Sequence, residues 1–128
     1  MAIPILGHLK IENPPTSVGN SSGTRRCTLT FNNNFKFTSL NAATTIQLDG
    51  CEDVIGQSGV IVITNASSTG SLSFSLTANF GSGASANNVL TPGGSSISFN
   101  TTANVKHMIS YYVSDTDAVL VNYIGMFA

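Results

Sequence analysis

Residues Gly59–Phe80, with the sequence GVIVITNASSTGSLSFSLTANF, contain the clearest structural signal in the chain. The run Val60–Thr64 is β-branched without a polar interruption, which is typical of a strand covered on both faces. A polar turn at Asn65–Gly70 follows, and Ser71–Thr77 then alternates strictly between hydroxyl and apolar side chains. The apolar face of this second segment consists of Leu72, Phe74 and Leu76. The stretch therefore predicts a β-hairpin in the core of an all-β protein.

Similar alternation marks strands on both sides of this hairpin. Further strands are predicted at Thr24–Phe31, Phe35–Phe37, Ala43–Leu48, Ser95–Phe99, Val105–Val113 and Asp117–Ile124. The first of them has Cys27, Leu29 and Phe31 on its inward face and pairs with the strand that carries Phe35 and Phe37. Gly81–Asn88 has the composition of a long exposed loop. About eight short strands at this spacing predict an antiparallel β-sandwich, a jelly-roll-like fold or a small barrel.

The first 24 residues differ from the rest of the chain. They contain three of the four prolines and end in a Ser- and Gly-rich stretch, so we expect an extended N-terminal arm, residues 1–24, before a β-domain, residues 25–128. The apolar residues of the arm are Ile3, Ile5, Leu6, Leu9 and Ile11. Two interpretations are open: the arm docks onto a neighbouring protein, or Gly7–Ile11 forms an edge strand on its own domain.

The chain carries very little charge. Only 9% of its 128 residues are charged and the net charge is −1, whereas about 25% is typical. The adjacent Arg25 and Arg26 are the only basic pair, so we expect no binding to nucleic acid. No segment approaches the roughly 20 apolar residues that span a bilayer. Weak self-repulsion suits surfaces that are covered in an assembly, which predicts a homo-oligomer, most simply a trimer.

The ionisable residues do not form a recognisable catalytic or metal-binding motif. His8 and His107 are the only histidines, and no HxH or CxxC spacing occurs. Glu52-Asp53 would point to opposite sides of a strand, and Asp115-Thr116-Asp117 is explained by a hairpin turn. We therefore expect no cofactor, no metal and no enzymatic activity.

The cysteines and the tyrosines allow two further expectations. Without an export signal, the chain is expected to fold in a cytoplasm, where Cys27 and Cys51 remain free thiols and Cys27 packs as a small apolar residue. Tyr112 and Tyr123 are the candidates for exposed rings that stack on a sugar.

Four motifs follow one another between residues 41 and 124. They are Gly56–Ile63 (GQSGVIVI), Gly70–Phe74 (GSLSF), Met108–Val113 (MISYYV) and Ala118–Val121 (AVLV), with a Gly-rich loop after Phe80. This order resembles a module found in virion proteins of tailed bacteriophages, in which Trp or Phe stands before the Gly-rich loop. The resemblance covers about two thirds of the chain and implies a virion structural protein.

The resemblance and the short chain lead to a functional expectation. Phage fibres are usually much longer, so the chain is expected to be a capsid decoration, or cement, protein that stabilises the head from outside. Its partners would be the major capsid protein, contacted through Ile3, Ile5, Leu6, Leu9 and Ile11, and other copies of itself at three-fold positions. It would lie on the capsid surface of the virion after assembly in the host cytoplasm. The alternatives are a small adhesive tail, fibre or head-fibre protein and a carbohydrate-binding module.

Overall fold

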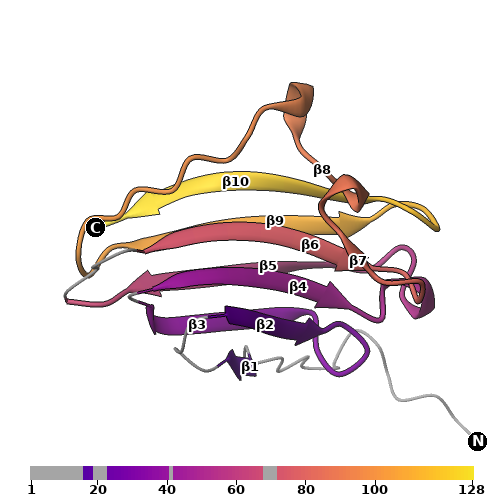
Figure 1. Ribbon diagram of the computed structural model, residues 1–128, viewed down its shortest axis with the longest axis horizontal. Helices are drawn as coiled ribbons and strands as arrows, with labels where there is room; N and C mark the ends of the chain where they lie inside the picture. The colour runs from indigo at the N-terminus through magenta and orange to yellow at the C-terminus, as the bar shows by residue number, and fades with distance from the viewer. Residues whose placement is uncertain (1–15, 19–22, 41, 68–71) are drawn as a thin grey trace, which may run out of the picture.

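The computed structural model describes residues 16–18, 23–40, 42–67 and 72–128, which form ten β-strands in two sheets (Figure 1). The strands are β1 (Thr16–Val18), β2 (Gly23–Thr28), β3 (Asn34–Leu40), β4 (Ala43–Asp49), β5 (Ser58–Asn65), β6 (Ser73–Asn79), β7 (Ala84–Ser85), β8 (Val89–Leu90), β9 (Lys106–Val113) and β10 (Val119–Phe127). Three short 3-10 helices are η2 (Cys51–Asp53), η3 (Ala86–Asn88) and η4 (Pro92–Gly94). Within the described ranges, no helix has the length and hydropathy that a membrane span requires.

The chain alternates between the two sheets over its first six strands. The large sheet has the order β1-β3-β5-β9-β10-β8, and the small sheet has the order β2-β4-β6-β7. Each of β3 to β6 therefore lies beside the strand two positions earlier and runs parallel to it. The later strands depart from this winding. β7 pairs antiparallel with β6, and β9 and β10 form an antiparallel hairpin whose first strand also pairs with β5.

The expectation of an all-β fold is confirmed at the level of strand content, but the expectation of purely antiparallel pairing is wrong, because both sheets are mixed. Of the eight pairings between described strands, five are parallel and three are antiparallel. The alternation of side chains is the same in both kinds of ladder, so it defines the face of a strand and leaves its direction open.

The predicted hairpin in Gly59–Phe80 is also wrong, although both of its strands exist. β5 lies in the large sheet and β6 in the small sheet, so the two strands face each other across the core. Seven residues, 66–72, join them, which is enough chain to cross the roughly 10 Å between packed sheets. A polar connection of this length suits a hairpin and a crossing between layers equally well. The predicted pairing of Thr24–Phe31 with Phe35–Phe37 fails in the same way, because β2 and β3 lie in different sheets.

One hydrophobic core lies between the sheets and follows the predicted alternation. Phe35, Phe37, Ile61, Ile63, Ile109 and Val113 from the large sheet are buried together with Cys27, Ile46, Leu48 and Ala78 from the small sheet. On β5 only alternate residues are fully buried, while Val60 and Val62 are half-buried. The expectation that this strand is covered on both faces is therefore wrong for its outer face.

Two further expectations fail at the ends of strands. β2 stops at Thr28 and the chain turns, so Phe31 is 87% exposed and does not continue the inward row of Cys27 and Leu29. The segment Ser95–Phe99 forms no strand, although Ile97 and Phe99 do pack against the core as predicted. The alternation in the sequence continues in both places, but the backbone forms no strand there, and Ile97 and Phe99 keep the predicted inward phase whereas Phe31 does not.

The segment after η4 is held in place by two buried polar side chains. Asn65 donates from Nδ2 to the carbonyl oxygens of Asn100 (2.9 Å) and Thr102 (2.8 Å). His107 contacts the same Asn100 oxygen through Nε2 at 2.9 Å and the hydroxyl of Tyr123 through Nδ1 at 2.8 Å. Because a carbonyl oxygen only accepts, Nε2 carries the proton and Nδ1 accepts from the hydroxyl of Tyr123.

This arrangement makes the protein sensitive to acid. Burial lowers the pKa of His107 below its usual value of 6.5, against a smaller opposing effect of the Asn100 carbonyl. At pH values between the pKa of His107 in the folded protein and its pKa in the unfolded chain, the unfolded chain binds the proton more readily. His107 therefore does not reduce stability above about pH 6.5, and it reduces stability as the pH falls below that value. We expect the unfolding free energy to fall from pH 7 to pH 5.5, by at most about 1.4 kcal/mol per pH unit from this group.

Urea unfolding at several pH values checks this expectation. The variant His107→Leu should be less stable at pH 7 and should lose this acid dependence. The variant His8→Gln, which removes the other histidine, should retain it. An unchanged acid dependence in His107→Leu would contradict the assignment to His107.

Candidate functional site

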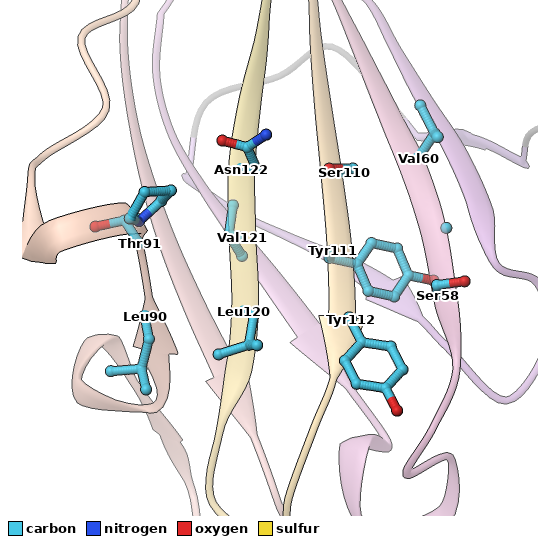
Figure 2. A pocket seen from close by; sticks show the side chains of 12 residues that line it. Ser58, Val60, Leu90, Thr91, Ser110, Tyr111, Tyr112, Leu120, Val121 and Asn122 are labelled. Carbon is cyan, nitrogen blue, oxygen red and sulfur yellow. The ribbon is translucent and has the colours of Figure 1, made fainter.

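A groove of about 630 Å³ lies on the outer face of the large sheet. Its floor is formed by β5, β9 and β10, and one wall is formed by β8 and the following Thr91 and Pro92 (Figure 2). The parallel pairing of β8 with β10, Val119 to Val89 and Leu120 to Leu90, places this wall beside the floor.

The apolar character of the groove comes from a row of residues across four strands. In register, Ser58 of β5 lies opposite Tyr112, Tyr112 opposite Leu120, and Leu120 opposite Leu90. The three larger side chains are 46% (Tyr112), 45% (Leu120) and 49% (Leu90) exposed. They occupy the outward phase of their strands, because the neighbouring Tyr111, Val113, Val119 and Val121 are buried in the core. The next row, Val60, Ser110 and Asn122, adds polar groups beside this apolar row.

The groove is electrically neutral. No Asp, Glu, Lys, Arg or His side chain is among the described residues that line it. Burial raises the pKa of Tyr111 to about 12, with a smaller lowering by the hydrogen bond from Gln57, so this hydroxyl also stays uncharged. Such a surface can bind an apolar or aromatic group surrounded by hydroxyls and amides, and it does not favour a charged ligand.

Beside the groove, a turn at Leu29–Asn33, here called the Phe31 turn, is fixed by hydrogen bonds. Gln57 donates from Nε2 to the carbonyl oxygens of Leu29 (3.0 Å) and Asn32 (3.4 Å). The hydroxyl of Tyr111 donates to the carbonyl of Asn33 at 2.8 Å, and Asn33 donates from Nδ2 to the carbonyl of Ser58 at 3.2 Å. The turn therefore presents the ring of Phe31 to solvent from a rigid base.

The structure decides part of what the sequence predicted about binding residues. Tyr112 is exposed in the groove, as predicted, whereas Tyr123 is half-buried against Phe99 and His107 and is not an exposed ring. The predicted arm residues Ile3, Ile5, Leu6, Leu9 and Ile11 lie outside the described residues.

The charged residues considered from the sequence remain dispersed. Glu52 and Asp53 are exposed on η2, and Asp115 and Asp117 are exposed in the turn between β9 and β10. Arg26 forms an ion pair with Asp49 at 3.6 Å. In the part of the chain that the structure describes, no three or more His, Cys, Asp or Glu side chains converge on a possible metal position.

Both cysteines are buried, free thiols that pack in the core. Burial raises the pKa of Cys27 to about 12, with a smaller contribution from Asp49, and raises that of Cys51 to about 11. Because the thiolate is the reactive form, both thiols are expected to react with a disulfide reagent at pH 8 at least about 100-fold more slowly in the native protein than in urea. A thiol assay should count two sulfhydryls after unfolding, and rapid reaction of the native protein would contradict the burial of these residues.

The groove itself was missed by sequence reasoning, although a signal for it exists. In Val119-Leu120-Val121 the two valines point inward, so the apolar Leu120 must point outward on a strand whose outer face would ordinarily be polar. Leu90 belongs to the same row only because β8 joins β10, a contact between residues 30 apart that no local pattern shows.

Comparison of the chain with protein-family models, with curated proteins and with solved structures finds no match.

Proposed function

We propose that the protein is a structural virion protein of a tailed bacteriophage that decorates the outer surface of the head. The observation that carries this proposal is the exposed, uncharged and largely apolar groove on the large sheet, because another protein can cover a surface of this kind. The motif order in residues 41–124 supports the virion setting through its resemblance to phage virion modules. We also propose that the two facing sheets form a β-sandwich.

The proposed mechanism is stabilisation by binding. A protein that binds only the assembled, expanded shell stabilises that shell by its binding free energy, about 2.7 kcal/mol per site when its free concentration is 100 times the dissociation constant. Many copies together would resist the pressure of packaged DNA without covalent chemistry. The binding partner is the major capsid protein, and the decorating unit is a trimer of this chain.

In this proposal the contact with the capsid is made by the arm. Ile3, Ile5, Leu6, Leu9 and Ile11 would lie along an exposed sheet edge of the capsid protein as an added strand. Pro4 limits the length of that strand, because proline donates no backbone hydrogen bond.

Binding of the purified protein to empty heads tests the function and the role of the arm separately. We expect saturable binding to expanded heads and little binding to unexpanded ones. Deletion of residues 2–12 should abolish binding while the circular dichroism spectrum of the β-domain is unchanged. If the full-length protein binds neither form of head, the proposed function is wrong; if the deletion variant still saturates expanded heads, only the arm mechanism is wrong.

One observation favours a second candidate function, a carbohydrate-binding module. The ring of Tyr112 is 46% exposed, and Ser110 and Asn122 lie in the next row. A sugar would stack on the ring and bond to these groups. Glycan binding that is lost in Tyr112→Ala would support this candidate, and its absence from a broad glycan panel would remove it.

A further inference from the structure

The ring of Phe31 is the most exposed large apolar side chain among the described residues, at 87%. It is held on a turn whose two ends are tied by Gln57 to the rest of the domain. Within the turn, Asn32 accepts from the backbone N–H of Asn33 and of Asn34 through Oδ1. Because these bonds already fix the backbone of the turn, only the side-chain freedom of Phe31 is lost when the ring is buried in a complex, so it is suited to act as an anchor.

The groove offers a matching receptor for such an anchor. Its exposed row of Tyr112, Leu120 and Leu90 can pack around an aromatic ring, and an aromatic pair with Tyr112 adds to the burial. Ser110 and Asn122 in the adjoining row can bond to the polar atoms of an approaching turn. The cavity of about 630 Å³ is large enough for a ring together with part of its turn.

The charge of the two surfaces fits a contact between copies. Neither the Phe31 turn nor the groove lining carries an Asp, Glu, Lys, Arg or His side chain, so the two surfaces meet without burying a charge. Burial of the exposed ring of Phe31 in the groove removes apolar surface of both copies from water.

We propose that the groove of one copy receives the Phe31 side chain of a second copy of this chain. The anchor and the receptor are different parts of the surface, so each copy can give Phe31 to one neighbour and receive it from another. Such contacts form a reciprocal pair or a ring where the rotation between copies closes, and an open filament where it does not. The proposal does not depend on a virion role, and it is tested on the purified protein without any particle.

Sedimentation equilibrium of the full-length protein and its variants measures this association. We expect Phe31→Asp and Leu120→Asp each to raise the dissociation constant at least about 30-fold, the effect of losing a central anchor. Ile55→Asp and Ile124→Asp are matched controls, because both residues are 48% exposed and lie outside the groove lining. They should leave the association within about threefold of the wild type.

Mixing the two disrupted variants gives the decisive result. Phe31→Asp retains an intact groove and Leu120→Asp retains an intact anchor, so the mixture should form a complex although each variant alone is monomeric. A monomeric wild type at millimolar concentration, an unaffected Phe31→Asp variant, or a mixture that stays monomeric would each overturn the proposal. If Leu120→Asp does not fold, as judged by circular dichroism, Tyr112→Ser replaces it as the groove variant.

Discussion

Replacement of Phe37 by alanine is expected to lower the free energy of unfolding by about 3–5 kcal/mol. Phe37 is fully buried between the two sheets, and its removal leaves a cavity that the surrounding strands can fill only in part. Since domains of this size have about 5–15 kcal/mol of stability, the loss is a large fraction of the total. Urea unfolding followed by circular dichroism measures it.

Phe31→Ala is the matched control, because it makes the same chemical change six residues earlier in the chain. Phe31 is 87% exposed, so this variant should remain within about 0.5 kcal/mol of the wild type at concentrations where the protein is monomeric. Equal losses in the two variants would show that β2 continues through Phe31 and that the turn is wrong.

The second large effect is expected at Gly59, where the sheet has no room for a side chain. A Cβ atom at this position would overlap the carbonyl oxygen of Asn33 and lie 2.7 Å from the hydroxyl of Tyr111. Because Asn33 is fixed by that hydroxyl and Tyr111 is buried, neither neighbour can move without breaking their 2.8 Å hydrogen bond. We expect Gly59→Ala to destabilise the protein by about 3 kcal/mol or more.

Gly83→Ala is the control, because it changes the backbone preference of a glycine without creating a steric overlap. Gly83 has φ of +115° and open space around a Cβ, so alanine there introduces only backbone strain, about 1–2 kcal/mol. Thermal or urea unfolding of both variants provides the comparison. If Gly59→Ala is no more destabilising than Gly83→Ala, the close approach of the Phe31 turn to β5 is contradicted.

The sequence specifies the faces of the strands better than their neighbours. Phe35 and Phe37 point inward as predicted because alternation depends only on the pleat of one strand. The partner of β5 depends instead on how the whole chain winds, and the turn-rich residues after Asn65 suit either arrangement. The end of β2 before Phe31 was missed for a similar reason, since Gln57, which fixes the Phe31 turn, lies 25 or more residues away in the sequence.

The candidate site shows the same division between local and distant information. The outward position of Tyr112 follows from the alternation of β9, and the prediction that it is exposed is confirmed. The groove around it requires β8 beside β10, and this pairing brings together residues that share no local pattern. The prediction that Tyr123 is exposed is wrong, because its hydroxyl contacts His107 on the neighbouring strand. The local sequence does not show this contact.

The number of copies per particle tests the central proposal most directly. Quantitative mass spectrometry of purified virions that contain this protein, with the major capsid protein as internal reference, gives that number. A decoration protein is expected at hundreds of copies per head, in a fixed ratio to the capsid protein. A few copies to a few dozen would contradict decoration of the head and assign the protein to a tail or fibre instead.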